Sequence, residues 1–393
     1  MGTTAARLRA VDPDELPAAL AAALHGGPPV APLPADPGER TRALAALRLD
    51  EPVPEPDTAV VVLTSGSTGQ PKGVVLSRAA VRASAAATSE RLGGPGDWVL
   101  ALPTHYVAGL MVLARAFLDS GTVTSLGPDL AGLDEVARTG RRRYLSVVPT
   151  QLVRGLADPA TTRALAGLDA VLVGGGPSPA GLLDRARAAG VPVRTTYGMS
   201  ETCGGCVYDG VPLAGVEVVL DDDGRVSLGG PTVFSGYRLR PDLTAAALRE
   251  GRALTADRAR WVEGTDGVRR LEVLGRIDDV VISGGLNVDL AEVERHAAGW
   301  PALAADPARP PAELVVLGVP HPEWGTEVVA VSDRALPVTG LRKHLSGSLP
   351  GDAAPRRLVV LDGLPRTSSG KIDRQRIRAL LSPDPPGAKE GTA

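Results

Sequence analysis

Short apolar runs alternate with amphipathic segments along the middle of the chain. The strand-like runs cover residues 59–63, 98–103, 122–126, 144–149, 170–175 and 192–197. Segments with helical spacing lie between them, among them Arg78–Leu92 behind Ser77 as a helix cap, Ala108–Leu118, Asp134–Arg142 and Ala180–Ala189. Strands separated by helices form parallel sheets through right-handed crossovers, so this region predicts an α/β fold.

The pattern changes after residue 215. Residues 217–228 predict a β-hairpin with its turn at 221–224, and further strands follow up to residue 275. From Asp278 the expected order is a short hairpin, a helix at 290–296, strands at 314–319 and 327–332, a helix at 338–345, a strand at 357–361 and a helix at 374–381. That order suits a separate α+β domain.

We therefore divide the chain into four parts. Residues 1–57 are rich in alanine and proline, with one helix expected near Pro17–Leu24 and loop elsewhere. Residues 58–277 are expected to form a large domain of parallel-rich sheets packed with helices, plus a β-rich subdomain. Residues 278–382 are expected to form a small mobile α+β domain, and residues 383–393 a disordered tail.

The amino-acid composition argues against several classes of protein. The chain has 393 residues, 44% of them hydrophobic, and a net charge of −3. This balance favours neither nucleic acid nor an anionic membrane as a partner. No apolar run reaches the roughly 18 residues of a membrane span, and the N-terminus has no apolar signal core. Two cysteines argue against a disulfide framework, so we expect a cytoplasmic protein.

The segment TSGSTGQPKG, Thr64–Gly73, joins two apolar runs. Its glycines let backbone N–H groups turn toward an anion, its hydroxyls add donors, and Lys72 adds a compact positive charge. Such a loop can hold a polyphosphate, although Pro71 stands where a Walker A motif has its second glycine. A solvated turn is the alternative. Only four of the 42 basic residues are lysines, and two of these, Lys72 and Lys371, stand in glycine-rich motifs.

Polar and glycine residues also follow two of the predicted strands, where α/β sheets place their ligands. The segments are VGGGPSP at 173–179 and TTYGMSET at 195–202. Glu201 offers a hard oxygen ligand for Mg²⁺, and Tyr197 offers a flat face for a base. Asp257 and Arg276 could hold ribose hydroxyls, and Lys371 stands in a glycine–serine loop near the C-terminus. Each of these features alone is more often structural than functional.

Taken together, these segments resemble the acyl-adenylate-forming superfamily, from about Thr58 to Leu381. The motifs follow the family order: the phosphate loop, YGMSET, Asp257, GRIDD with ISGG, and the terminal SSGK. The superfamily includes acyl- and aryl-CoA ligases, adenylation domains of peptide synthetases, and luciferases. The resemblance implies an AMP-forming acid–CoA ligase that uses ATP, CoA and Mg²⁺ with a small carboxylic acid, and it leaves a homodimer open.

The resemblance also implies roles for particular residues. Lys371, Glu201 and Lys72 would carry the catalysis, and Glu201 would hold Mg²⁺. The residues that would bind ATP are Thr64, Ser65, Gly66, Ser67, Thr68, Gly69, Lys72, Gly175, Gly176, Tyr197, Gly198, Ser200, Asp257, Arg276 and Lys371. Asp278 would be a hinge, and Gly284 and Gly285 would face CoA. The residues near the acyl substrate would be Arg115, His105, Tyr106 and Ala108.

Three runs narrow the resemblance: LPTHYVAGL, VPTQL and TYGMSETCGGCVYDG look most like the 2-succinylbenzoate–CoA ligases of menaquinone biosynthesis, in their short actinobacterial form. Their substrate is a dicarboxylate, so one carboxylate remains to be held when the other is activated. Arg115 lies in the apolar run AGLMVLARAFL and needs an anionic partner if it faces inward. In the resembling ligases an arginine at this place meets a substrate carboxylate. The alternative is that Arg115 lies on an exposed stripe of its helix.

The chain departs from the family pattern in several places. It is shorter than typical members, mostly at the N-terminus, and His105-Tyr106 replaces the usual Phe-His pair. Ser200 replaces the usual threonine before the glutamate. Cys203 and Cys206 form a CxxC that cannot complete a zinc site alone, so we expect small packed residues there. The other interpretations are a different aryl- or acyl-CoA ligase, a carrier-loading adenylation enzyme, and an inactive nucleotide-binding regulator.

Overall fold

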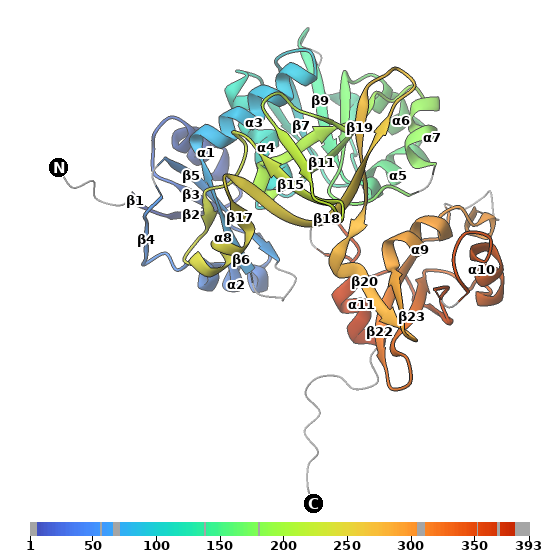
Figure 1. Ribbon diagram of the computed structural model, residues 1–393. Helices are drawn as coiled ribbons and strands as arrows, with labels where there is room; N and C mark the ends of the chain where they lie inside the picture. Colours follow the sequence, from blue (N-terminus) through green and yellow to red (C-terminus); the bar gives the residue numbers. More distant parts are fainter. Residues whose placement is uncertain are drawn as a thin grey trace, which may run out of the picture. The chain divides into compact units, whose positions relative to one another are not determined.

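The computed structural model describes residues 6–55, 57–65, 71–136, 139–179, 181–304, 311–351, 353–367 and 370–381. The chain divides into two compact units (Figure 1). The first comprises Met1–Thr255 and Trp261–Glu272, and the second comprises Ala256–Arg260 and Val273–Ala393. Two long strands, β18 (Arg252–Glu263) and β19 (Arg269–Arg276), therefore contribute residues to both units.

The first sheet of unit 1 has five strands. Their order is β16 (Gly236–Tyr237), β6 (Pro71–Ser77), β5 (Thr58–Ser65), β3 (Val30–Pro32) and β2 (Arg9–Val11). Successive valines of β5 point to opposite faces, as a strand requires. Val60 and Val62 pack with α1 (Leu16–Leu24) and α3 (Arg78–Arg91), whereas Val61 packs with α2 (Pro37–Leu47). Both faces of this sheet are therefore covered.

Residues 1–57 contain more regular structure than the sequence predicts. Besides β2 and β3, β1 (Ala6–Arg7) pairs with β4 (Pro52–Val53). Helix α2 begins behind Asp36, whose carboxylate accepts a hydrogen bond from the Glu39 amide at 2.7 Å. The expectation of loop outside residues 17–24 is wrong, because β2 and β3 join the same sheet as β5 and α2 packs against that sheet.

The second sheet of unit 1 has seven strands. In order they are β13 (Val211–Pro212), β12 (Gly204–Tyr208), β11 (Val193–Met199), β10 (Ala170–Val173), β9 (Arg142–Val147), β7 (Gly96–Leu100) and β8 (Val123–Ser125). From β8 to β11 neighbouring strands are parallel, whereas β12 and β13 run antiparallel. The sheet confirms the predicted α/β fold and positions the ends of β10 and β11 side by side.

Helices cover both faces of the second sheet. Helix α4 (Val107–Leu118) packs with Trp98 and Tyr144, while α5 (Pro149–Ala157), α6 (Pro159–Ala166) and α7 (Leu182–Ala188) pack with Val99 and Leu145. The helix predicted at Asp134–Arg142 is wrong. The described residues there form a 3-10 turn, η1 (Leu133–Glu135), and Arg142 already begins β9. Gly140, with φ +81°, marks the turn between them.

The third sheet is formed by strands from the last part of unit 1 in the sequence, together with the long strands β18 and β19. Its strands are β14 (Glu217–Leu220), β15 (Arg225–Gly229), β18 and β17 (Leu248–Arg249), with β19 paired to β18, and the short helix α8 (Pro241–Ala247) precedes β17. The hairpin predicted at 217–228 is confirmed. Its turn is closed by the Asp221 carboxylate, which accepts hydrogen bonds from the amides of Asp223 and Arg225.

Unit 2 contains a five-stranded sheet with β21 (Leu286–Asp289), β20 (Val280–Ser283), β23 (Gly325–Ser332), β22 (Leu314–His321) and β24 (Arg357–Val360). Helices α9 (Leu290–Ala297) and α10 (Val338–Leu345) pack on one face with Val316 and Val328. Helix α11 (Arg374–Leu381) packs on the other face through Ile377, against Val315 and Val329. The turns η3 (Ile277–Asp279) and η4 (Pro301–Ala304) complete the unit, whose element order matches the prediction.

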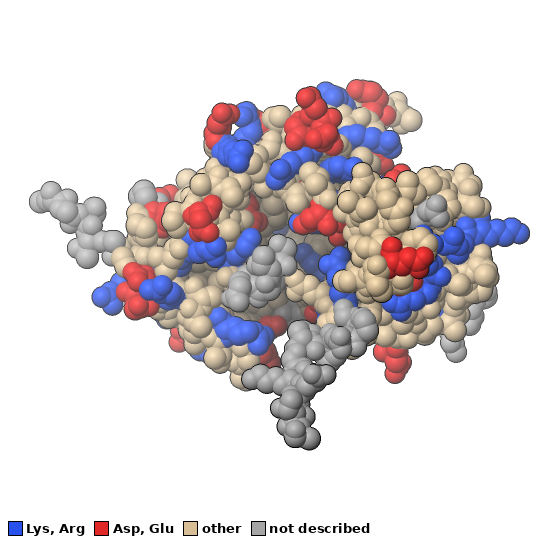
Figure 2. Space-filling view, turned by 60° about the horizontal axis from the view of Figure 1, so that its bottom comes forward, with Lys and Arg blue, Asp and Glu red and all other residues tan. Residues whose placement is uncertain are grey.

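Charge is mixed over the face drawn in Figure 2, where Lys and Arg residues alternate with Asp and Glu residues. This face carries no broad patch of one sign, in keeping with the net charge of −3. Among the residues described, no helix combines the length and the hydropathy needed to cross a lipid bilayer.

Candidate active site

The predicted phosphate loop joins the antiparallel strands β5 and β6. Thr64 and Lys72 lie opposite each other at the end of this hairpin. Gly66, Ser67, Thr68 and Gly69, together with the side chain of Ser65, lie outside the described residues. The described hairpin therefore fixes where the loop starts and ends, and Lys72 is the second residue of β6, just after the loop.

Lys72 and Glu201 both contact Tyr237. The Tyr237 hydroxyl donates to Glu201 Oε1 at 2.7 Å, and Lys72 Nζ lies 5.4 Å from the centroid of the Tyr237 ring. Burial, with the nearby Glu201 charge, raises the pKa of Tyr237 well above its usual range, so the hydroxyl stays protonated and continues to donate. A carboxylate and an ammonium group thus lie beside the same tyrosine, and the ammonium group belongs to β6.

Strand pairing and a backbone hydrogen bond bring Tyr237 close to Lys72 and Glu201. Strand β16 places Tyr237 opposite Val74 of β6, two residues after Lys72. Glu201 lies in the 3-10 turn η2 (Ser200–Thr202), and its carbonyl accepts the Phe234 amide at 2.9 Å. Tyr237 did not figure among the candidates from sequence, because nothing near it in the sequence signals a link to Glu201.

Arg238, the neighbour of Tyr237, has a structural role. The residue is 5% exposed, and its guanidinium donates to four backbone carbonyls, those of Leu47, Arg48, Glu51 and Pro52. Its backbone N–H donates to Gly73 O at 2.7 Å. Arg238 therefore ties the segment after α2 to the strand that carries Lys72.

Glu201 fits a magnesium site of the kind that nucleotide enzymes use. Among the described residues no three His, Cys, Asp or Glu side chains gather in a way that could hold a metal alone. Mg²⁺ in phosphoryl-transfer sites commonly takes one or two carboxylates, with the remaining ligands from water and substrate phosphates. Tyr237 contacts one oxygen of the carboxylate, Oε1. Glu201, a single oriented carboxylate in a turn that contacts β6, could supply such a ligand.

The predicted nucleotide residues of the second sheet lie at strand ends. Gly175 and Gly176 follow β10, while Tyr197 and Gly198 lie near the end of β11, its parallel neighbour. A Cβ on Gly198 would lie 2.1 Å from Gly204 O, so only glycine permits this approach of β11 to β12. No atom of the described residues lies within 4 Å of the Cβ position of Gly176. These four residues lie at the carboxyl ends of two parallel strands, the usual place for a ligand.

His105, Tyr106 and Ala108 lie at the start of α4. The rings of His105 and Tyr106 are 4.2 Å apart, and Tyr106 is the cap of the helix. His105 Nε2 is buried and has no hydrogen-bond partner among the described residues. Burial lowers the pKa of His105, with a smaller opposing effect from the charge of Glu39. The imidazole is therefore neutral at neutral pH.

Arg115 is buried on α4. Its guanidinium carbon lies 5.2 Å from the Trp98 ring, and the residue is only 4% exposed. The exposed-stripe alternative is therefore wrong. Arg115 Nε has no hydrogen-bond partner within the described part of the chain. The arginine faces inward, as a substrate contact requires, although it lies about 10 Å along the helix from Ala108 at 1.5 Å per residue.

The two cysteines are packed residues. Cys203 and Cys206 are free and fully buried beside α4. Burial raises the pKa of the Cys206 thiol to about 11 and that of Cys203 further. Both remain thiols at neutral pH, which leaves them poorly nucleophilic.

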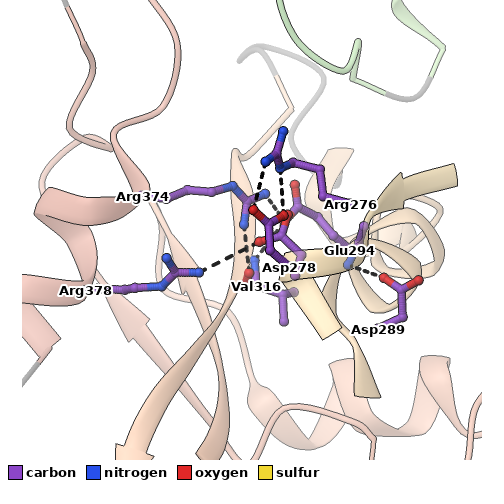
Figure 3. Close-up of polar contacts among 9 residues, drawn as sticks. Arg276, Asp278, Asp289, Glu294, Val316, Arg374 and Arg378 are labelled. Atoms are coloured by element: carbon purple, nitrogen blue, oxygen red, sulfur yellow. Dashed lines mark hydrogen bonds and ion pairs between the residues drawn. The ribbon is translucent and has the colours of Figure 1, made fainter. Parts of the chain in front are cut away.

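The remaining candidates belong to unit 2, where Arg276 contacts two of the others, Asp257 and Asp278. Arg276 donates to both carboxylate oxygens of Asp278 at 2.8 Å (Figure 3). Its Nη1 also lies 3.5 Å from Asp257 Oδ1. The Arg276 guanidinium lowers the pKa of Asp278, and Asp278 in turn raises that of Arg276. The residues proposed for the ribose and for the hinge thus form one charged cluster.

Gly284 and Gly285 form the turn between β20 and β21. Their φ angles are +56° and +84°, values that glycine adopts without strain. The Gly284 amide donates to Trp324 O at 3.1 Å. Lys371 is exposed, and its carbonyl accepts the Thr367 amide at 2.8 Å. The candidates therefore divide between the units, with Lys72 and Glu201 in the first.

Comparison with known proteins defines the class. The sequence pattern of the AMP-binding enzymes matches residues 5–238, and that of the AMP-binding enzyme C-terminal domain matches residues 305–371. The chain belongs to the AMP-binding enzyme family.

Within this family, the chain is similar to proteins named as 2-succinylbenzoate–CoA ligases. A Mycobacterium tuberculosis protein named "Probable 2-succinylbenzoate--CoA ligase" is 44% identical over 373 residues, which cover 91% of this chain and 93% of that protein. A 2-succinylbenzoate--CoA ligase of Geobacillus sp. is 31% identical over 84% of this chain and 71% of that protein. The structure of o-succinylbenzoate CoA synthetase from Bacillus subtilis in complex with the acyl-adenylate intermediate OSB-AMP superposes with a TM-score of 0.69 at 26% identity, covering 92% of this chain and 80% of that chain.

Proposed function

We propose that this chain is an ATP-dependent 2-succinylbenzoate–CoA ligase that works through an acyl-AMP intermediate and releases AMP and pyrophosphate. The observation that carries the proposal is the 44% identity, over nearly the whole of both chains, to the mycobacterial protein of that name. The acyl-adenylate complex of the Bacillus subtilis synthetase supports the intermediate. The partners proposed are the acid, ATP and CoA. A role in menaquinone biosynthesis and a cytoplasmic location remain predictions.

In the first half-reaction, a carboxylate oxygen of the acid attacks the α-phosphorus of ATP. The bond from that phosphorus to the bridging oxygen breaks, and pyrophosphate leaves. We assign Lys72 and the loop at 64–73 to the β- and γ-phosphates, where an ammonium group offsets their charge. Glu201 would hold Mg²⁺, which neutralises phosphate charge when bound. Tyr237 orients Glu201 through its 2.7 Å hydrogen bond.

The nucleoside would lie at the strand ends described above. Gly175 and Gly176 would flank one side of the adenine and Tyr197 the other, because glycines allow a flat base to approach the backbone. Asp257, next to Arg276, would accept hydrogen bonds from the ribose hydroxyls. The acid would lie near His105, Tyr106 and Ala108, with Arg115 for the second carboxylate.

Lys371 would bring the two anions together. Its ammonium group would lie between the attacking carboxylate and the α-phosphate. At about 4 Å and an effective dielectric constant of about 20, such a contact contributes about 4 kcal/mol. Since this interaction is strongest where the two anions meet, it would stabilise the transition state more than either bound reactant.

In the second half-reaction, the CoA thiol sulfur attacks the acyl carbon, the acyl–oxygen bond breaks, and AMP leaves. We assign Asp278 as the hinge about which the C-terminal domain, residues 278–382, changes position between the two steps. Gly284 and Gly285 would let the narrow pantetheine arm approach the backbone.

The test is a pyrophosphate-release assay with MgATP over a panel of aromatic and aliphatic acids, followed by addition of CoA and measurement of thioester absorbance. We expect release with 2-succinylbenzoate and thioester after CoA. Release with a different acid alone would contradict the substrate. Acyl-AMP that never passes to CoA would indicate a carrier-loading enzyme, and no release with any acid would indicate an inactive regulator.

A further inference from the structure

The backbone just before Lys371 is held by an arginine. Arg366 Nη1 donates to Gly370 O at 3.0 Å, and its Nη2 donates to both carboxylate oxygens of Glu313, at 2.5 and 2.6 Å. Gly370 O belongs to the peptide bond that leads into Lys371. Glu313 directly precedes strand β22. Arg366 therefore fixes the peptide before Lys371 to the central sheet of unit 2.

Hydrogen bonds join described residues on both sides of Lys371. The Thr367 amide donates to Lys371 O at 2.8 Å, and the Gly370 amide donates to Thr367 O at 2.8 Å. Arg366 and Ile372 form an isolated antiparallel β-bridge. Gly370 has φ +82°, a conformation that a side chain would strain. These contacts thus fix the main chain on both sides of an exposed lysine side chain.

A second arginine holds the chain after Lys371. Arg374, the first residue of α11, donates to Glu294 Oε2 at 2.6 Å and to Val316 O at 2.9 Å (Figure 3). Glu294 Oε2 also accepts the Val316 amide at 3.0 Å. Val316 lies in β22 and Glu313 directly precedes this strand, so both arginines attach the segment around Lys371 to the first residues of β22 or the residue before it. One attachment precedes Lys371 and the other follows it.

Resting on the proposed role of Lys371, we propose that Arg366, through Glu313, is a positioning residue for the adenylation step. A lysine side chain is long and flexible, so the reach of its ammonium group depends on where its main chain is held. An arginine fork can contact a carbonyl and a carboxylate at once, whereas a lysine cannot do so with the same fixed directions. Arg366 itself touches neither reactant in this assignment.

A double-mutant cycle tests the proposal. Arg366→Met removes both contacts, and pyrophosphate release is measured without CoA. Misplacement of a catalytic group typically costs about 10- to 100-fold, so we expect a loss of that size. If Arg366 acts only through Lys371, the same substitution should cause no further loss in a Lys371→Ala background. Thioester formation from synthetic acyl-AMP and CoA should be unchanged by Arg366→Met.

A matched control is present in the same unit. Arg357 Nε and Glu327 Oε2 form an ion pair at 2.9 Å between β24 and β23, and no contact found for either reaches the described residues around Lys371. Arg357→Met should leave adenylation near the wild-type rate. Glu313→Gln keeps the side-chain size and should show a smaller loss than Arg366→Met, so it serves if the latter fails to fold.

Two results would overturn the positioning role: an undiminished adenylation rate in Arg366→Met, or an equal loss in the presence and absence of Lys371. A wild-type chain that releases no pyrophosphate with any acid would instead overturn the proposed function, so the two failures are distinguishable.

Discussion

Replacing Tyr237 with phenylalanine removes a single hydrogen bond from the candidate active site. The hydroxyl donates to Glu201 Oε1 at 2.7 Å, whereas the ring packs edge-on against Phe234 at 5.0 Å and lies under Lys72. Phenylalanine keeps both ring contacts. The substitution therefore tests the orientation of Glu201 with little change to Lys72.

The hydrogen bond to Glu201 determines how much Tyr237→Phe should weaken Mg²⁺ binding. A hydrogen bond to a charged group contributes about 1.5–3 kcal/mol, and 1.4 kcal/mol corresponds to about tenfold. Residues that orient a metal ligand typically change metal affinity by about 10- to 100-fold. We expect Tyr237→Phe to raise the Mg²⁺ concentration needed for half-maximal adenylation by that factor. The raised pKa of Tyr237 keeps its hydroxyl protonated, so the effect should be the same across neutral pH.

Two measurements check this expectation: the Mg²⁺ dependence of pyrophosphate release, and binding of Mn²⁺ in the presence of ATP, followed by electron paramagnetic resonance without turnover. Tyr144→Phe is the matched control. Its hydroxyl also donates in the core of unit 1, to Gly94 O at 2.9 Å, but away from Glu201. An unchanged metal dependence in Tyr237→Phe, or an equal change in Tyr144→Phe, would refute the reasoning.

Four other substitutions give distinct readouts. Lys371→Ala should lower acyl-AMP formation by about 10²-fold or more and spare thioester formation from preformed acyl-AMP; unchanged adenylation would contradict its role. Asp278→Pro should leave adenylation largely intact and reduce thioester formation, and equal loss of both steps would count against a hinge. Burial lowers the pKa of His105 below 6.5. The unfolded chain therefore takes up this proton first as the pH falls, and the wild type should lose unfolding free energy below about pH 6.5. In urea titrations His105→Gln should lose less, and identical pH profiles would argue against a buried neutral imidazole. Arg238→Met should lower the unfolding free energy by about 3 kcal/mol or more, because four carbonyls lose their donor; a midpoint shift near zero would show that water replaces it.

Much of the fold could be predicted because its strands carry unbroken apolar runs. Val60, Val61 and Val62 are all buried, since helices cover both faces of the sheet, and this produces a continuous signal. The N-terminal elements lack such a signal. Strand β3 has three residues, one of them proline, and only Ala43 and Leu47 are buried in α2. Short elements that are completed by distant partners do not stand out in the sequence.

Candidate residues could be predicted where a short sequence motif follows a strand. They could not be predicted where a side chain contacts a residue that is far away in the sequence. The ends of β10 and β11 follow from strand order, because parallel strands end at one edge. Tyr237 is separated from Glu201 by 36 residues and reaches it only because β16 pairs with β6. Arg366 is likewise 53 residues from Glu313. Nothing in either segment specifies its partner.

The two kinds of basic residue occupy different positions, and their geometry explains the division. Arg238 binds four carbonyls, and Arg366 and Arg374 each bind a carboxylate and a carbonyl, which requires several donors in fixed directions. Lys72 and Lys371 each offer one compact charge on a flexible stem. Phosphate charge is redistributed as a phosphorus–oxygen bond breaks, so a group that can follow it suits the reaction better than a rigid fork. We therefore expect Arg238, Arg366 and Arg374 to hold main-chain segments in place, and Lys72 and Lys371, in their proposed roles, to contact the phosphate groups.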